Sequence, residues 1–514
     1  MRKTSAASDL VGHPVGRRQF LTLSAAGLAA AGLPRAARAQ GKRSGELVAG
    51  LSERMLTLDP ANHYSISSTS VHRHMFDPLV DVTNDSKFVP ALAESWRAVN
   101  NTSWRFTLRK NVTFHDGTPF NADSVLYTLR RVKDNTKLIK SFVYQDIESV
   151  EKDGDYAVTV TSKRPFGSLP AHLTMLGMLP PHAAKNEDAF FQKPIGTGPF
   201  RFVSWTHGDH IVLSANPGYW KPAQPRVEKV TFRFIPELFT RAAGLRAGEI
   251  HVVDRVTPDM VETLKGTRGV KVHDVPAVEA QRWIFQLAKE PVKDQRLRQA
   301  ISLAIDRNVI IKELLLGYGR PVDSPVPPGL IGHTSLPPKP YDPEKARQIL
   351  KQAGYTNVSL DFVLMKDLYP KQLEITQAVA AMLGEVGIKV NIKNLEIATA
   401  REHRSAGTYD MFFSGWAHMP HDPDWYFGQW FTKAGSEKLT RYNNPRVEQL
   451  IAEGRVPDPK VRQAKYEELE RILWDEDAEI WPYYSVAIYG VSDRLRNFEP
   501  RRDYYVLLSD VAIA

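Results

Sequence analysis

The stretch of sequence that decides the fold runs from residue 106 to residue 120 and reads FTLRKNVTFHDGTPF. From residue 104 to residue 109, apolar and polar side chains alternate, and this period of two predicts a β-strand. The segment Asp116-Gly117-Thr118-Pro119 predicts a turn. Asn121 then opens a helix in which Val125 and Leu129 recur at helical spacing. A strand, a turn and a helix in this order indicate a fold that mixes α and β structure.

The same signals recur on both sides of this stretch, without the strict alternation of a barrel. They predict one sheet flanked by helices in each half of the chain, so the fold class is mixed α/β (α+β). The Pro-rich segment 321–343 reads as an exposed connector. Strands are predicted at 200–203, 210–213, 230–234, 250–253, 359–364, 388–392 and 410–413, and helices at 239–246, 294–317, 344–353, 373–385, 447–453 and 460–474.

Composition narrows the function. The chain has 514 residues and no cysteine, which suits two to four structural units and excludes a disulfide scaffold, a Cys-ligated metal centre and a thiolate nucleophile. Lys and Arg number 67 against 58 Asp and Glu, a net charge of +9. Residues 1–39 hold six basic residues and one acid, or +5, so the other 475 residues carry only +4. Nucleic acid is therefore not an expected partner.

The N-terminus has the pattern of a cleaved export signal. Arg17-Arg18 is followed by an apolar run of about 14 residues, too short for the roughly 20 that cross a bilayer, and then by Ala37-Arg38-Ala39. Residues 1–39 are therefore predicted to be removed after Ala39. The arginine pair resembles the address of the twin-arginine translocase, with an ordinary secretory signal as the alternative. Without a nearby cysteine, a soluble periplasmic protein with no lipid anchor is expected.

Motifs of known catalytic sites are not found. There is no P-loop, no GxSxG and no HExxH, so no enzyme activity and no cofactor are predicted. His72 and His74 would face the same way in an extended strand, and His418 and His421 stand near Asp422. Either pair can hold a metal or can be an ordinary hydrogen-bonded group, and the second reading is preferred for both.

Aromatic residues are dense between residues 416 and 431, in a segment expected to be a loop. Six of its sixteen side chains are aromatic, and they stand beside two acids and two prolines. Aromatic faces with a few fixed polar groups suit a cavity that encloses a small organic ligand. The alternative is a second hydrophobic cluster beneath a loop.

Ten segments in order resemble the bacterial extracellular solute-binding proteins of family 5, the periplasmic receptors of peptide, dipeptide and nickel ABC importers. Each segment is weak alone, but together they cover nearly all of the chain after the signal. They include 58–60, 75–80, 91–96, 106–120, 196–200, 216–220, 247–250, 292–307, 341–346 and 387–390.

The resemblance implies a two-lobed periplasmic binding protein fold, in its large variant with an extra subdomain in the first lobe. Lobe I would comprise residues 40–75, 195–278 and 487–514, the additional subdomain residues 76–194, and lobe II residues 279–486. The hinge is expected near 278–285 and 483–488. A monomer that encloses a small solute between its lobes and delivers it to the membrane permease of an ABC importer is implied.

One residue that departs from the family's pattern bears on which class of ligand the protein binds. Peptide-binding members place an Asp three residues after a Gly-Trp pair to hold the ligand's ammonium group, and here Gly415-Trp416 is followed at that spacing by Met419. A non-peptide ligand, such as an opine, a sugar conjugate or a metal chelate, is therefore the alternative to a peptide. A secreted metal-dependent hydrolase that uses His418, His421 and Asp422 is the alternative to a receptor. The predicted ligand-binding residues are Tyr64, Trp283, Phe285, Lys366, Tyr369, Trp416, Met419, Asp422 and Trp425.

Overall fold

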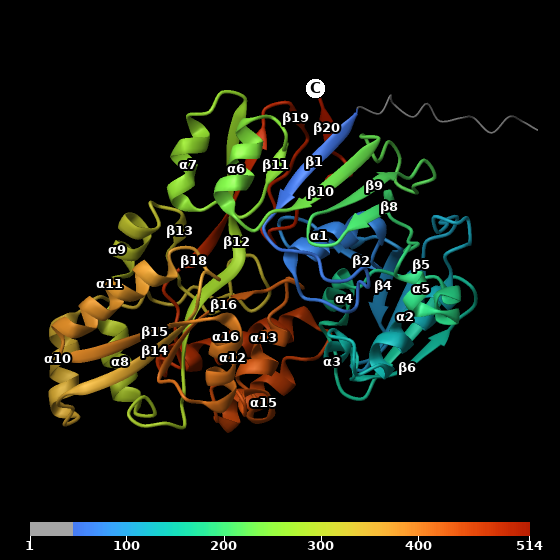
Figure 1. Ribbon diagram of the computed structural model, residues 1–514. Coiled ribbons are helices and arrows are strands. Elements are labelled where there is room, and N and C mark those ends of the chain that lie inside the picture. The colour runs from blue at the N-terminus through green and yellow to red at the C-terminus, as the bar shows by residue number, and fades with distance from the viewer. Residues whose placement is uncertain (1–44) are drawn as a thin grey trace, which may run out of the picture. The chain divides into compact units, whose positions relative to one another are not determined.

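The computed structural model describes residues 45–514, and the predicted signal at 1–39 lies outside them. The described chain mixes helices with one large sheet and several small ones, as predicted (Figure 1). The main path of the large sheet runs in the order β15-β14-β16-β12-β18-β11-β1-β10-β9-β8. Strands from the two halves of the sequence therefore belong to a single sheet, whereas the sequence predicted one in each half.

The first lobe is built around β1 (Glu46–Leu51), which pairs in parallel with β10 (Lys229–Phe234) and β11 (Val252–Val253). The predicted hairpin forms from β8 (Phe200–Thr206) and β9 (His210–Ala215). Val230, Phe232 and Phe234 alternate inward along β10 and bury one face of the sheet. The same core includes residues from both ends of the described chain, such as Leu47 and Leu508. Helices α1 (Ile66–Met75), α6 (Leu238–Arg246) and α7 (Pro258–Lys265) belong to this lobe.

A four-stranded sheet forms the additional subdomain. Its order is β4-β5-β7-β6, and the decisive stretch begins in β5 (Ser103–Leu108), as predicted. The Asn121 side chain accepts a hydrogen bond from the Asp123 amide and caps α2 (Ala122–Asp134), so the predicted helix start is confirmed. Phe106 from the sheet and Leu129 from α2 share a separate core. The remaining strands are β4 (Ala93–Ala98), β6 (Ile147–Lys152) and β7 (Ala157–Ser162).

The second lobe is built on β14 (Val358–Met365), β15 (Ile388–Leu395) and β16 (Met411–Ala417). Predicted helices form at α10 (Pro343–Gln352), α11 (Gln372–Glu385), α15 (Pro445–Glu453) and α16 (Pro459–Asp475). The predicted helix 294–317 is shorter: α8 (Gln295–Leu303) ends before Asp306, whose side chain caps a new turn at Asn308. The sequence did not predict α12 (Ile397–Ala406) or α13 (Asp424–Trp430).

Two strands pass through both lobes. The segment from Val270 to Pro276 of β12 (Val270–Phe285) pairs with β18 (Tyr484–Ser492), and from Glu279 onward β12 pairs with β16. The register shifts between Pro276 and Ala280, where Pro276 has no amide hydrogen to donate. The irregular step of the sheet therefore lies where β12 passes from its pairing with β18 to its pairing with β16 (Figure 1).

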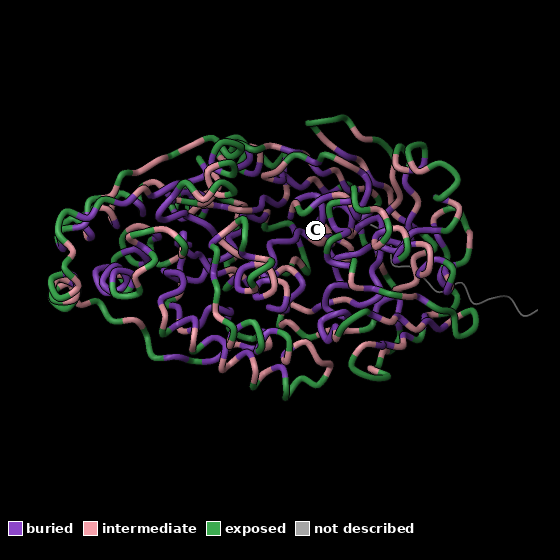
Figure 2. Tube along the Cα trace, turned by 90° about the horizontal axis from the view of Figure 1, so that it is seen from below, coloured by how far each residue is buried: buried purple, intermediate pink, exposed green. Residues whose placement is uncertain are grey.

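Burial follows this division. Buried residues lie in the interior of the molecule, and exposed residues lie mainly at turns and on the outer helices (Figure 2). Among residues 45–514, the structure contains no helix with the length and apolar character that a membrane span requires.

Candidate ligand-binding site

The aromatic segment predicted as a loop is a strand end, a short connection and a helix. Trp416 lies near the C-terminal end of β16. Trp425, Tyr426, Phe427 and Trp430 lie on α13. The prediction of a loop was wrong because residues 424–430 form two helical turns that bury Tyr426, Phe427 and Trp430 against the second lobe. Trp416 and Trp425 are left half-buried at the edge of this packing.

Trp416 and Trp425 belong to an aromatic cluster where the two lobes meet. The Trp425 ring centroid lies 5.2 Å from that of Trp416, on the second lobe. It also lies 5.1 Å from the ring of Tyr64 and 5.5 Å from that of Phe142, both on the first-lobe side. Tyr64 is 37% exposed and Phe142 is 48% exposed, so the first-lobe half of the cluster stays open to solvent. We call Tyr64, Phe142, Trp416 and Trp425 the interlobe aromatic cluster.

Two predicted contact residues lie in the core instead. Trp283 and Phe285 have no exposed surface and pack inside the second lobe. The Trp283 ring lies 5.8 Å from Phe362 and 6.0 Å from Phe413, between β12 and the neighbouring strands. The structure corrects both predictions, because a ligand cannot reach these rings without taking this core apart.

Asp422 is held by an arginine of its own lobe. The two carboxylate oxygens of Asp422 each accept a hydrogen bond of 2.8 Å from Arg462, and Asp422 is 2% exposed. A carboxylate bound in this bidentate way has no free charge for a ligand. The prediction that Asp422 contacts the ligand is therefore corrected.

Asp424 is similarly engaged. It accepts hydrogen bonds from Arg455 Nε at 2.9 Å and from Ser168 Oγ at 3.0 Å. Burial alone would raise the pKa of Asp424, but the charges of Arg455 and Arg462 lower it to about 2. Neither Asp422 nor Asp424 replaces the acid that is missing at Met419.

The other predicted residues lie near the lobe interface in different ways. Met419 packs against the first-lobe core although it follows β16 in the chain. The Tyr369 hydroxyl accepts a hydrogen bond of 2.9 Å from the amide of Gly415. Lys366 is exposed and forms an ion pair of 3.1 Å with Glu396. An anionic group of a ligand can therefore pair with Lys366 only if it displaces Glu396.

The histidine pairs do not form a metal site. Residues 72 and 74 lie on helix α1, where they do not share a face as they would in the extended strand supposed from the sequence. His72 Nδ1 lies 2.7 Å from His63 Nε2, while His74 Nε2 accepts a hydrogen bond from the Leu508 amide. His421 is 2.9 Å from Ser86 Oγ of the first lobe, and Asp422 is taken by Arg462. No group of three or more His, Asp or Glu side chains suited to a metal exists among residues 45–514.

A polar cluster beside Gly415 was missed by sequence reasoning. An ideal Cβ at Gly415 would lie 2.9 Å from Gln281 Nε2, 2.9 Å from Tyr369 Cε1 and 3.0 Å from Glu279 Oε1. These side chains come from β12 and from the segment after β14, and a Cβ at residue 415 would displace their ends. Glu279 also accepts a hydrogen bond of 2.6 Å from the Tyr504 hydroxyl of the first lobe. The signal available in the sequence was a single acid in the segment 277–285, which also holds Gln281 and Arg282.

One cavity adjoins the aromatic cluster. It has a volume of about 370 Å³ and lies between the subdomain and the second lobe. Phe142 and Trp425 line it together with Phe166, Arg164 and Arg455. Its two arginines are paired, Arg164 with Asp146 and Arg455 with Asp424. The cavity therefore offers three aromatic rings beside paired polar groups, next to the interlobe aromatic cluster.

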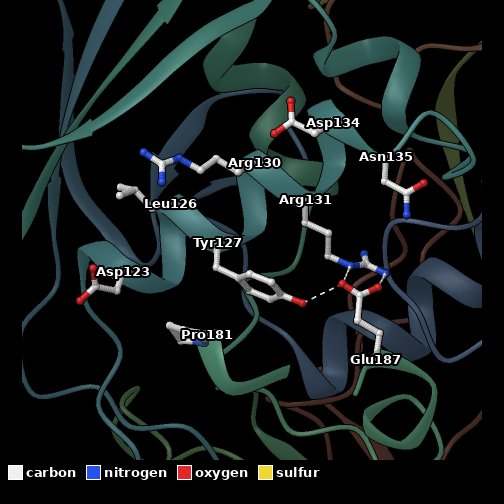
Figure 3. Close-up of a pocket in the computed structure, with 9 residues that line it drawn as sticks. All are labelled: Asp123, Leu126, Tyr127, Arg130, Arg131, Asp134, Asn135, Pro181 and Glu187. Atoms are coloured by element: carbon white, nitrogen blue, oxygen red, sulfur yellow. Dashed lines mark hydrogen bonds and ion pairs between the residues drawn. The ribbon is translucent and has the colours of Figure 1, made fainter. Parts of the chain in front are cut away.

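A larger cavity of about 790 Å³ lies along α2, away from the lobe interface (Figure 3). Its polar groups are already matched within the protein. Glu187 accepts hydrogen bonds from Tyr127 and Arg131, and Arg131 also binds Asp59 at 2.6 Å. Asp123 is paired with Lys152. This groove therefore lacks the unmatched polar groups expected of a ligand site.

Comparisons with known proteins agree on one family. The sequence model described as "Bacterial extracellular solute-binding proteins, family 5 Middle" matches residues 87–438. The glutathione-binding protein GsiB of Escherichia coli K12 is 27% identical over 450 residues, which cover 84% of this chain and 87% of GsiB.

Solved structures give the same answer. DppA of Helicobacter pylori, a periplasmic binding protein solved with the peptide STSA, is 26% identical with a TM-score of 0.78 and covers 92% of this chain and 98% of its own. AgaA of A. tumefaciens R10, solved with agropinic acid, is 25% identical with a TM-score of 0.78 and covers 91% and 99%. The match extends over almost the whole described chain.

Proposed function

Because this chain belongs to the bacterial extracellular solute-binding proteins of family 5, we propose that it captures a small peptide or peptide-like solute between its two lobes and delivers it to the membrane permease of an ABC importer. ATP hydrolysis belongs to the partner proteins, and no catalytic residue is assigned to this chain. GsiB is named as a glutathione-binding protein, and DppA was solved with a peptide.

The interlobe aromatic cluster carries this proposal. Across the interface, the Trp425 ring lies 5.1 Å from that of Tyr64 and 5.5 Å from that of Phe142, and Trp416 lies 5.2 Å from Trp425 on its own side. A solute that lies against these rings contacts both lobes only when the lobes are closed. Binding then favours the closed state over the open state by the difference in affinity, which is the signal that a permease can read.

The hinge of this motion is proposed at the two lobe crossings. The register shift between Pro276 and Ala280 of β12 and the neighbouring Tyr484 end of β18 support it. We further propose the division into lobe I at residues 40–75, 195–278 and 487–514, a subdomain at 76–194 and lobe II at 279–486. The separate core clusters of the first lobe, the subdomain and the second lobe support this division, although Leu179, Ala183 and Phe190 of the proposed subdomain pack in the first-lobe core.

The solute contacts are proposed at Tyr64, Trp416, Trp425 and Tyr369, with Met419 beside them. Lys366 is a proposed contact for an anionic group of the solute. An opine remains the second candidate ligand, since AgaA was solved with agropinic acid and since Met419 replaces the acid that holds a free amino terminus.

Export to the periplasm is also proposed. The pattern of residues 1–39 supports removal of a twin-arginine signal peptide and release of a soluble, monomeric protein without a lipid anchor. The family is extracellular by its description.

The proposal is tested with protein from residue 40 onward, unfolded and refolded to remove bound solute. It is mixed with a casein digest containing glutathione, washed, and denatured so that retained molecules can be identified by mass spectrometry. We expect retention of a few peptides together with a higher melting temperature and a smaller radius of gyration. Retention of no solute, or conversion of solutes into products, would contradict the receptor assignment.

A further inference from the structure

Lys140 is a buried lysine that has no acidic partner of its own. It is 3% exposed, and its Nζ donates hydrogen bonds of 2.7 Å to the Pro60 carbonyl and 2.9 Å to the Met175 carbonyl. Among residues 45–514, no Asp or Glu forms an ion pair with it. Burial of an unpaired ammonium group costs free energy, and an apolar side chain of similar length would avoid that cost. The lysine is therefore placed for its hydrogen bonds and not for packing.

The charges around Lys140 do not neutralise it. Asp59 attracts the ammonium group, but its two oxygens accept hydrogen bonds of 3.2 and 2.6 Å from Arg131. Arg131 also binds Glu187 (Figure 3). Burial, opposed only in part by Asp59, lowers the pKa of Lys140 from 10.5 to about 7. At neutral pH this lysine is thus balanced between its charged and uncharged forms.

Two histidines complete the surroundings of this lysine. His63 lies close to Pro60 in the chain, and its Nε2 lies 2.7 Å from His72 Nδ1 of α1. Burial and the charge of Lys140 lower the pKa of both histidines, that of His72 to about 3. Both rings are therefore neutral at pH 7 and add no second cation beside Lys140.

Lys140 connects the loop at residues 59–64 of the first lobe with the proposed subdomain. Its backbone amide donates a hydrogen bond of 3.0 Å to the Ala61 carbonyl, next to the side-chain bond to Pro60. The second side-chain bond reaches Met175, which lies in the subdomain. One residue thus holds the first-lobe loop against the subdomain by hydrogen bonds of both its backbone and its side chain.

The two segments that Lys140 joins carry the first-lobe half of the interlobe aromatic cluster. Tyr64 lies four residues after Pro60. Phe142 lies two residues after Lys140. The ring centroids of Tyr64 and Phe142 are 5.7 Å apart, and each ring also faces Trp425 across the lobe interface. Both side chains are exposed, so core packing does little to fix their positions. The hydrogen bonds of the segments that carry them set the spacing of the two rings.

We propose that Lys140 is a positioning residue for solute binding, because it joins the first lobe to the subdomain next to Tyr64 and Phe142 and so fixes the distance between these rings. This inference rests on the proposed function, in which the interlobe aromatic cluster contacts the solute. Lys140 itself touches no solute, since its side chain is buried. Its two charge-assisted hydrogen bonds offset the cost of burial, and no apolar residue could make them.

The first test measures retention of solute. Refolded protein is offered the casein digest with glutathione, and the molecules that it retains are quantified by mass spectrometry. Lys140→Met removes both side-chain hydrogen bonds and should retain at least about tenfold less than the wild-type protein. Lys140→Gln keeps two N–H donors and should recover part of the loss. Lys137→Met is the matched control, because Lys137 is exposed on the same segment and its loss should leave retention unchanged.

A second comparison separates positioning from general stability. Phe142→Ala removes one of the two rings whose spacing Lys140 sets. Addition of Lys140→Met to that variant should therefore lower retention by less than about twofold further. A lysine that only stabilises the subdomain would give the full loss in both backgrounds.

Urea unfolding without solute checks the state of Lys140 itself. Between about pH 7 and about pH 10, the folded protein binds fewer protons at this residue than the unfolded chain, so its free energy of unfolding should rise with pH. Lys140→Met should lack this part of the rise, whereas Lys137→Met should keep it. The same unfolding curves show whether each variant is folded, and Lys140→Gln carries all three comparisons if Lys140→Met does not fold.

The outcomes separate this inference from the receptor function. Wild-type retention in folded Lys140→Met, the full loss in the Phe142→Ala background, or a wild-type pH dependence in Lys140→Met would overturn the role of Lys140 and leave the receptor function standing. Retention of no solute by the wild-type protein would overturn both.

Discussion

The hydroxyl of Ser168 donates a hydrogen bond of 3.0 Å to Asp424 Oδ2, and this bond joins the subdomain to the second lobe. Next to it the amide of Gly167 donates to the Arg455 carbonyl at 2.6 Å. The two bonds lie far in sequence from β12 and β18, where the chain crosses between the lobes. They form a second connection between the lobes that opening would break.

Gly167→Ala should prevent this connection. An ideal Cβ at residue 167 would lie 2.1 Å from the Val456 carbonyl oxygen, and backbone cannot move aside as a flexible side chain does. We expect the variant to bind solute at least tenfold less tightly and to keep a larger radius of gyration in small-angle scattering with the casein digest present. Gly384→Ala is the matched control, since nothing lies within 4 Å of its new methyl group. Equal compaction of both variants would rule out a closing role for this contact.

Trp425→Ala should weaken retention of solute at least tenfold with little change in melting temperature, because it removes a half-buried ring between Tyr64 and Trp416. Trp474→Ala provides the comparison: this ring is 4% exposed and stacks on Trp481 at 5.8 Å. Loss of a buried Trp costs about 3–5 kcal/mol, so Trp474→Ala should lower the melting temperature and spare affinity. If both variants behaved as core substitutions, the aromatic cluster would be packing and not a binding surface.

Acid should destabilise the protein through His418. This side chain has no exposed surface, and burial together with the charge of Arg282 lowers its pKa from 6.5 to about 3. The folded state thus binds fewer protons than the unfolded state below pH 6.5, and the free energy of unfolding falls as the pH falls from about 6.5 toward 3. At pH 4.5 the resulting loss in the free energy of unfolding is about 3 kcal/mol.

Urea unfolding of the His418→Gln variant measures the part of this pH dependence that is due to His418. Between pH 6.5 and pH 4.5 the variant should lose less free energy of unfolding than the wild-type protein, since glutamine does not titrate. The exposed His207→Gln should retain the full pH dependence. A wild-type slope in His418→Gln would show that His418 stays neutral in both states or is solvated when folded.

Replacement of both Arg17 and Arg18 by lysine should trap the precursor in the cytoplasm. The twin-arginine translocase is expected to recognise the two guanidinium groups and not charge alone. Cell fractionation and immunoblotting distinguish precursor from mature protein, and Arg35→Lys should mature normally. Normal maturation of the double variant would favour the ordinary secretory route.

The strand β5 and the helix α2 were predictable because their signals are local. Period-two alternation and the Asn121 cap do not depend on distant residues. By contrast, β12 contains Pro276 and several charges, so it has no clear period, and its pairing is set by β18 and β16, which lie more than a hundred residues away. Tertiary pairing, not propensity, makes this strand.

The candidate site could also be predicted only in part from the sequence. Trp416 and Trp425 stood out by density, but Phe142 lies about 280 residues away and gave no signal that it would join them. The sequence indicates Trp283 and Phe285 as contacts because it cannot separate an aromatic ring in a core from one at a surface, and both rings are buried. Glu279 was overlooked because one acid in a strand usually faces water.

The position of β18 in the sheet determines how late in synthesis the first-lobe core can be completed. β18 lies between β11 and β12 in the sheet, and residues from Ala487 to Val511 complete the first-lobe core that begins at Leu47. During synthesis the ribosome must therefore release nearly the whole chain before the core around its earliest strands is complete. At about 5–20 residues per second, the core residues of β1 wait roughly 20 s or longer for these C-terminal core partners. Newly made first-lobe segments are exposed during that time, which is when chaperones and proteases have access to them.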